Sequence, residues 1–395
     1  MLCCYRSVLA SFALVALASP ARAVEIRFNA FGDFSVAMPI GEPASKEDDE
    51  LFKAHGASPQ PVNTGQGFQV AGSDFVITAD LNEHLTFQSE VNLQTCRGCS
   101  NELDLDVERM YLNYAIHPLF NFQMGLFFTP IGYQNRNLYA RAWLMNSVQI
   151  HDFTEEDLGL VPTHTIGAMV HGTLALGASN LMYAVSMGNG RASTPNSSVY
   201  ARDTNPASEV AFLLEYRLTT LKNFRVGLSG WTDQAVTKMY GPEYGDGPIA
   251  DKQLKLRDVG FNPYVVIDNG SFGLSAEAVS ATMTDKNKKN EQLKDNGWRN
   301  ESFHYRSYTA EVVAHLQSGK LHPYLRTDRT QLPNENGGPF LSQRDGEHKY
   351  VPDFRAVMVG VAYDVFTFNR LKLEYIAHQD GPRRNTVVAQ TAYGF

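Results

Sequence analysis

Apolar and polar residues alternate one by one in many short stretches of the chain. Residues 85–94 read LTFQSEVNLQ, so Leu85, Phe87, Val91 and Leu93 share one parity and polar side chains fill most of the other. Successive side chains of a β-strand point to opposite faces, so this stretch predicts a strand with one apolar and one polar face. The pattern returns at 120–128, 209–218, 224–229, 272–278, 308–316 and 370–375.

About sixteen strands of this kind fit the chain, each long enough to cross a bilayer when tilted. Their connections alternate between short turns, such as 82–84 and 268–270, and longer segments, such as 40–67 and 129–162. Bacterial outer-membrane barrels sort short turns and long loops in this way, whereas a soluble sandwich has no reason to do so. The predicted strands start near Ile26, Phe68, Leu85, Leu103, Phe120, Thr163, Leu181, Ser208, Phe224, Leu256, Ser271, Phe303, Lys320, Phe354, Phe368 and Asn385.

The predicted fold is therefore all-β: a 16-stranded antiparallel transmembrane barrel formed by residues 24–395. Residues 1–23 are expected to be a cleaved signal peptide, because Arg6 precedes an apolar stretch and Ala21 and Ala23 form an A-x-A cleavage site. That stretch is shorter than the roughly 20 residues a membrane-spanning helix needs.

The last predicted strand places Val387, Ala389, Thr391, Tyr393 and the final Phe395 on one face. This resembles the C-terminal signature of outer-membrane barrels, in which a strand that ends in an aromatic residue is recognised by the assembly machinery. The resemblance implies that Tyr393 and Phe395 form the assembly signal. It also implies a location in the outer membrane of a Gram-negative cell, in contact with its lipid.

A barrel of this size is too wide for side chains to fill, so we expect a water-filled lumen. Unpaired charge in a dry interior would cost several kcal/mol per group, whereas a wet lumen tolerates charged side chains, solvated or in ion pairs. The net charge of −8 argues against a nucleic-acid partner. The residues expected to line the pore are Arg109, Arg217, Arg225, Glu277, Glu311 and Arg355.

Residues 129–162, the longest predicted loop, follow the fifth strand. The first half contains Arg136, Tyr139 and Arg141, and the second half contains the acidic run Glu155, Glu156 and Asp157. Opposed charges at a constriction would set a field across a pore. An external loop with a solvated acidic turn is the alternative. Because loops of this length in compact folds are usually functional, we favour the constriction.

Two stretches next to this loop resemble a known family. Residues 107–132 read VERMYLNYAIHPLFNFQMGLFFTPIG, and residues 164–172 read HTIGAMVHG. They resemble the hairpin before the pore loop, and the strand after it, in porins related to the phosphate-selective O and P group. The resemblance implies a channel whose third long loop narrows the pore. The inferred inner face here is of mixed sign, unlike the arginine ladder and lysine cluster of the phosphate-selective members.

Cys96 and Cys99 form a C-R-G-C sequence in the predicted second external loop. In an oxidising compartment a local disulfide is the first interpretation, and redox or metal function are the alternatives. No His follows Cys99 as c-type haem attachment requires, and no further metal ligands are adjacent. We therefore expect no metal and no cofactor.

The sequence favours a porin, a channel for passive diffusion of small polar solutes or ions, with a homotrimer as one oligomeric state. A barrel sleeve around a partner such as a multihaem cytochrome is the alternative, although a sleeve has no use for an obstructing loop. An outer-membrane enzyme is less favoured, because no G-x-S-x-G, H-E-x-x-H or phosphate-binding loop occurs.

Overall fold

The computed structural model describes twelve stretches of the chain. Cys96, Cys99 and the expected signal peptide lie outside them. The described residues are 24–41, 67–95, 103–138, 142–148, 150–154, 161–190, 208–220, 223–240, 248–285, 302–331, 354–380 and 384–395.

Within these stretches, sixteen strands form one closed antiparallel barrel, in which each strand pairs with its neighbours in sequence and β1 pairs with β16. This confirms the predicted fold class. The strands are β1 (Glu25–Ile40), β2 (Gly67–Asp80), β3 (Leu85–Thr95), β4 (Leu103–His117), β5 (Phe120–Phe128), β6 (His164–Leu176), β7 (Ser179–Asn189), β8 (Ser208–Leu218), β9 (Asn223–Tyr240), β10 (Pro248–Asp268), β11 (Phe272–Asp285), β12 (Ser302–Ala314), β13 (Leu321–Gln331), β14 (Phe354–Phe366), β15 (Asn369–Asp380) and β16 (Asn385–Gly394).

Most strands start within two residues of the predicted position, and β10 differs most. Alternation placed its start near Leu256, but the strand begins at Pro248. Its pairing with β9 continues through Gln253↔Lys238 and Leu254↔Thr237. Backbone hydrogen bonding can extend a hairpin beyond the segment that alternates between apolar and polar residues, so the sequence pattern underestimates its length.

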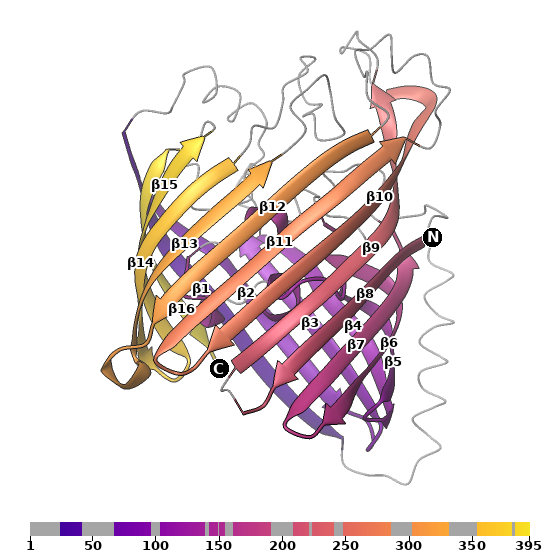
Figure 1. The fold of residues 1–395 in the computed structure, drawn as a ribbon, viewed down its shortest axis with the longest axis horizontal. Coiled ribbons are helices and arrows are strands. Elements are labelled where there is room, and N and C mark those ends of the chain that lie inside the picture. The colour runs from indigo at the N-terminus through magenta and orange to yellow at the C-terminus, as the bar shows by residue number, and fades with distance from the viewer. Residues whose placement is uncertain are drawn as a thin grey trace.

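The short connections and both ends of the described chain lie at one end of the barrel, which we call the turn end. Glu25 pairs with Asp80 there, and Phe395 bonds to Ala30 through both backbone groups at 2.8 Å. The opposite end, where the longer connections attach, is called the loop end. Figure 1 shows the strands strongly inclined, with the C-terminus beside the short turns at the bottom of the view.

Apolar side chains cover the outside of the barrel and polar ones cover the inside. Met124, Phe261 and Val359 are 56%, 51% and 53% exposed, whereas Glu215 and Glu374 are 0% and 1% exposed. A soluble protein has the opposite distribution, so this surface suits contact with lipid. In the described part of the chain, no helix is long and apolar enough to cross a membrane.

Strand β14 faces the opposite way to the prediction. Ala356, Met358 and Ala362 are buried on its inner face, while Val359 is exposed outside. Arg355 lies on the same outer face of the strand as Val359 and is exposed. The prediction that Arg355 lines the pore is therefore wrong. Both faces of this strand are largely apolar, so alternation could not distinguish them.

Candidate functional site

Five of the six predicted pore-lining residues lie on the inner face, and each has a partner there. Arg109 forms an ion pair with Glu90, and Arg217 forms one with Glu215. The Arg225 guanidinium lies 5.6 Å from the centre of the Tyr133 ring. The remaining two, Glu277 and Glu311, accept hydrogen bonds from residues of the 129–162 segment.

The described parts of this segment, hereafter the long segment, lie against the inner wall of the barrel. They comprise residues 129–138, 142–148, 150–154 and 161–162. The first part contacts β9 and β11, and the later parts contact β12, β13 and β15. The segment therefore crosses from β5 to the strands on the other side of the barrel before returning to β6.

Glu277 of β11 fixes the first turn of the long segment. Its two carboxylate oxygens accept hydrogen bonds from the backbone N–H groups of Tyr133 at 3.1 Å and Gln134 at 3.0 Å. These groups lie at the start of the short helix α3 (Gln134–Asn137), where N–H groups have no partner within the helix. Gly132 precedes them with φ +59°, and a Cβ there would overlap the side chains of Glu277 and Asn262.

Asn135 holds the two ends of the long segment together. Its amide nitrogen donates to the carbonyl oxygens of Thr129 at 3.1 Å and Thr163 at 3.0 Å. The side chain is fully buried, so both hydrogen bonds are shielded from water. The start and the end of the long segment are thus fixed to each other as well as to the wall.

Arg136 of α3, Arg217 of β8 and Arg225 of β9 form a basic cluster on one side of the lumen. A single carboxylate, Glu215, accepts from Arg217 and from the Tyr264 hydroxyl, and lies 3.9 Å from Arg136. Burial lowers the pKa of the Arg136 guanidinium, and the charge of Glu215 opposes this effect. An arginine remains protonated under such conditions, so the cluster carries net positive charge.

Two buried cations of the facing wall hold the middle of the long segment. Lys372 of β15 donates to the carbonyl oxygens of Ala142 at 2.6 Å and Ser147 at 2.8 Å. Arg326 of β13 donates to the Ser147 hydroxyl at 2.7 Å while it pairs with Asp328. Both side chains supply hydrogen bonds to buried carbonyl or hydroxyl oxygens that would otherwise need a water molecule as partner.

Carboxylates and a second arginine complete this attachment. Asn146 donates to Glu311 at 2.9 Å, and the Val148 N–H donates to Glu374 at 3.2 Å. Arg370 donates to the Met145 carbonyl at 3.2 Å. Residues 145–148 are therefore bound by β12, β15 and the β13 cation together, which leaves this stretch little freedom to move.

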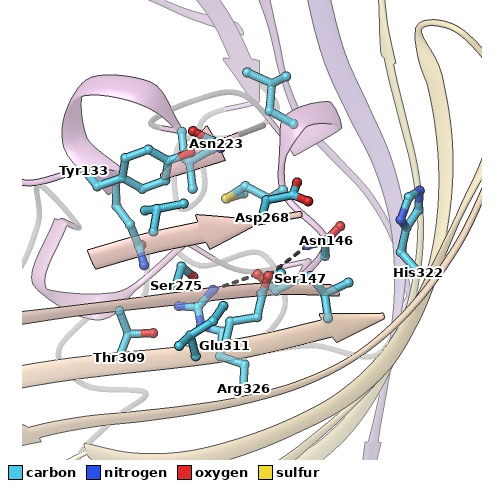
Figure 2. Close-up of a pocket in the computed structure, with 18 of the residues that line it drawn as sticks. Tyr133, Asn146, Ser147, Asn223, Asp268, Ser275, Thr309, Glu311, His322 and Arg326 are labelled. Atoms are coloured by element: carbon cyan, nitrogen blue, oxygen red, sulfur yellow. Dashed lines mark hydrogen bonds between the residues drawn. The ribbon is translucent and has the colours of Figure 1, made fainter. Parts of the chain in front are cut away.

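A cavity of about 260 Å³ lies between the long segment and the inner faces of β10 to β13. Figure 2 shows Tyr133, Asn146 and Ser147 on one side, and Thr309, Glu311 and Arg326 on the other. The lining also includes His315, His322 and Arg370 near the turn end. The cavity therefore has mixed charge, with both hydrogen-bond donors and acceptors.

Several predicted site residues lie outside the described residues, namely Tyr139, Arg141, Glu155, Glu156 and Asp157. Sequence reasoning missed Asn135, Asn146 and Ser147, although each contacts the wall or closes the segment. Small polar residues in a loop carry no periodic signal, so nothing in the pattern could have selected them. Among the described residues, no group of three His, Cys, Asp or Glu side chains could hold a metal ion.

No protein-family model matches the chain, and no curated protein matches its sequence. Solved structures do resemble it. Outer-membrane-expressed OmpT of Vibrio cholerae gives a TM-score of 0.55 at 12% identity, over 95% of this chain and 99% of that one.

Two further structures are similar. An anion-selective porin from Comamonas acidovorans gives a TM-score of 0.57 at 9% identity, over 94% and 100% of the two chains. The outer-membrane channel DcaP of Acinetobacter baumannii gives a TM-score of 0.53 at 10% identity, over 95% of this chain and 99% of that one. The chain therefore has a porin-like fold, and the finer resemblance to the phosphate-selective O and P group stays a prediction.

Proposed function

We propose that this protein is an outer-membrane porin that lets small polar solutes or ions diffuse through a water-filled lumen. One observation carries the proposal: a closed barrel with an apolar outside holds a long segment against a charged inner wall. A barrel that served only as an anchor would not need such a segment, nor so many charged groups facing inward.

The long segment would act as the constriction of this channel. Supporting this role, its described residues are bound to strands on the far side of the barrel by Glu277, Lys372 and Arg326. Solutes would pass beside the basic cluster of Arg136, Arg217 and Arg225. Charge acts more strongly there than in bulk water, because the surrounding protein lowers the effective dielectric constant.

The ion preference would be weak. Arg141 would add to the basic side, and the acidic run Glu155, Glu156 and Asp157 would oppose it. Neutralising these three acids is expected to make the channel more anion-selective, which shifts the reversal potential toward the equilibrium potential of the anion. Neutralising Arg136 together with Arg141 is expected to shift it toward the equilibrium potential of the cation. Identical reversal potentials in both variants and the parent would contradict a constriction built from this segment.

The decisive experiment measures single-channel conductance of the refolded protein in a planar bilayer. A porin gives stepwise, ohmic conductance in simple salt solution with no partner present. A sleeve for a multihaem cytochrome would instead copurify with haem and would conduct only when emptied. An enzyme of the outer membrane would show neither behaviour, and no described contact favours that alternative.

A homotrimer is the oligomeric state we propose, and one solved structure of Vibrio cholerae OmpT is described as a trimer form. The outer surface of β1 is apolar up to the loop end, where Met38 and Ile40 are 44% and 50% exposed. Such a face can be covered by a second copy as well as by lipid. The native mass of the detergent-solubilised protein would distinguish a trimer from a monomer.

A further inference from the structure

The two arginines that line the cavity between the long segment and β10 to β13 are already fully engaged. Arg326 donates to both carboxylate oxygens of Asp328 and to the Ser147 hydroxyl. Arg370 donates to both oxygens of Asp364 at 2.6 and 3.0 Å, and its third nitrogen donates to the long segment. Each guanidinium nitrogen therefore has an acceptor within the protein, and little donor capacity remains for a solute.

The two carboxylates that line the cavity lack a cation of their own. Glu311 of β12 accepts from the Asn146 amide at 2.9 Å (Figure 2), and Asp268 of β10 accepts from the Gly270 N–H at 2.7 Å. Within the described ranges, neither forms an ion pair with a lysine or an arginine. The nearby Lys372 does not neutralise them, because its charge is shared with other carboxylates of the wall. None of the described lining residues belongs to the basic cluster, so the cavity lining carries net negative charge.

A pair of histidines adds an acceptor beside Asp268. His322 Nε2 lies 3.0 Å from the Asp364 carboxylate, which only accepts, so this nitrogen carries a proton. With both rings neutral, His322 Nδ1 must accept from His315 Nδ1 at 2.8 Å, and His315 Nε2 is left without a proton. That nitrogen is buried 3.5 Å from the Asp268 carboxylate. One donor-rich group placed against both could donate to each of them.

Gln134 supplies a further acceptor from the long segment. Its side chain lines the cavity and is only 7% exposed, and its Oε1 has no hydrogen-bond partner among the described residues. The backbone N–H of the same residue is fixed by Glu277, so the side chain is held at this place. A buried amide oxygen without a donor is destabilising, and a solute that carries N–H groups would satisfy it. Acceptors therefore lie both on the long segment and on the barrel wall.

The size of the cavity and the spacing of its carboxylates limit the solute. A cavity of about 150 Å³ holds benzene, so one of about 260 Å³ holds roughly ten non-hydrogen atoms. Asp268 pairs with Gly273 of β11, and Glu311 pairs with Ser275 of the same strand. The Cα atoms of the two acids are therefore two strand spacings and two residues apart, about 12 Å. A short solute with a donor group at each end fits this arrangement.

We propose that this cavity binds a short aliphatic solute with two protonated amine groups. The proposal rests on the proposed porin function and names the solute class for it. The ammonium groups would donate to Glu311 and Asp268, with Gln134 and His315 as further acceptors. An ammonium has three donors and no acceptor, so it matches a lining whose unpaired groups are acceptors. The hydrocarbon between the two amines would contact apolar lining residues such as Val313.

The experiment is a calorimetric titration of the refolded protein in an uncharged detergent at low salt. The probes are 1,5-diaminopentane, 1-aminopentane, 1,5-pentanediol and glutarate, which share a chain of five carbons. The diamine is expected to bind, the monoamine to bind about tenfold more weakly, and the diol and glutarate not to bind. Diamine binding should weaken as salt is added, because salt screens the carboxylates.

Two variants test the residues that the proposal names. E311Q/D268N removes both charges but keeps an oxygen that accepts from Asn146 and Gly270, and it should weaken diamine binding at least tenfold. Q134M removes the buried amide and should weaken binding about threefold. Equal diamine affinity of E311Q/D268N and the parent would overturn the proposal. If the double variant does not fold, equal affinity of Q134M and the parent overturns it instead.

The matched control is E25Q/E83Q, which also removes two carboxylates. Both side chains are exposed at the turn end, outside the cavity. This variant is expected to bind the diamine like the parent. Equal binding of 1,5-diaminopentane and 1,5-pentanediol by the parent would contradict recognition by charge and would also overturn the proposal.

Channel conductance separates this proposal from the proposed function. In a planar bilayer, 1,5-diaminopentane should interrupt the potassium current of the parent briefly and reversibly, whereas 1,5-pentanediol should not. If the parent binds the diamine in the titration but does not conduct, the porin proposal fails and the diamine site stands. If the parent conducts but does not bind the diamine, the diamine site fails and the porin proposal stands.

Discussion

Arg136 and Arg225 are the cluster cations with the weakest ion pairing. Glu215 binds Arg217 directly but stays 3.9 Å from Arg136. Arg225 donates a hydrogen bond to the Asn223 side chain and lies over the Tyr133 ring. We predict that R136Q/R225Q shifts the reversal potential toward cations in a salt gradient and changes conductance little. The reason is that these charges act in a poorly screened part of the path.

The control for this pair is Arg27→Gln. Arg27 is half exposed at the turn end and pairs with Asp80 at 2.8 Å, so its charge is screened by water. The reversal potential of the Arg27→Gln variant should equal that of the parent. A double variant with the parent's reversal potential would mean that Arg136 and Arg225 do not face the conduction path.

Gly132 is required by both its backbone conformation and its surroundings. Its φ of +59° disfavours any side chain, and a Cβ would overlap the Glu277 and Asn262 side chains. We predict that Gly132→Ala weakens the attachment of the long segment by about 1–3 kcal/mol. Single-channel recordings should show larger and noisier conductance, because the segment loses its hydrogen bonds to Glu277.

Gly177 offers a matched comparison for this substitution. Its φ is +63°, but no atom lies within 4 Å of a Cβ added there. Gly177→Ala should therefore be destabilised only by the strained backbone conformation, without any steric overlap. Its conductance should equal that of the parent. If the two alanine variants behaved alike, crowding against Glu277 would have no part in positioning the segment.

At the scale of elements, the long segment depends on the wall more than on its own secondary structure. Its described helices, α3, η1 (Ala142–Leu144) and η2 (Asp152–Thr154), are three or four residues long. Helices this short are not stable alone. The hydrogen bonds from Lys372, Arg326, Glu277, Glu311 and Glu374 therefore determine where the segment lies.

Lys372→Met tests this dependence. The change removes two hydrogen bonds and leaves the carbonyl groups of Ala142 and Ser147 without that donor, at a cost of about 1–3 kcal/mol for each unsatisfied group. We predict higher conductance with an intact barrel, because strand pairing does not involve this side chain. Lys320→Met, at an exposed turn position, should leave conductance as in the parent.

At the scale of the whole molecule, closure of the barrel depends on the last strand. Phe395 exchanges two backbone hydrogen bonds with Ala30, and its ring is 68% exposed. We predict that Phe395→Ser lowers the amount of assembled barrel in cells, since the aromatic ring is the expected assembly signal. The same variant refolded in detergent should keep the thermal stability of the parent, because the backbone ladder is retained.

Phe366→Ser is the matched control, since Phe366 is also an exposed aromatic residue at the turn end, 74% exposed. Its assembly in cells should equal that of the parent. If Phe395→Ser and Phe366→Ser assembled to the same extent in cells, the prediction that Phe395 is part of the assembly signal would be wrong.

The sequence by itself determined the barrel, because alternation and the order of short and long connections are local properties that repeat along the chain. Starts such as Leu85, Leu103 and Asn385 were predicted at the residue where they occur. Alternation failed for β14, where Ala356 and Met358 face inward among other apolar residues and Arg355 faces outward. A one-residue shift exchanges the two faces, and only the neighbouring strands determine which face is inside.

Only the tertiary structure decided how the long segment is held. The sequence indicated its length and its charges, but Glu277 and Gln134 are 143 residues apart, and Lys372 and Ser147 are 225 apart. No local pattern encodes such pairs, because they arise when closure of the barrel brings distant strands around one interior.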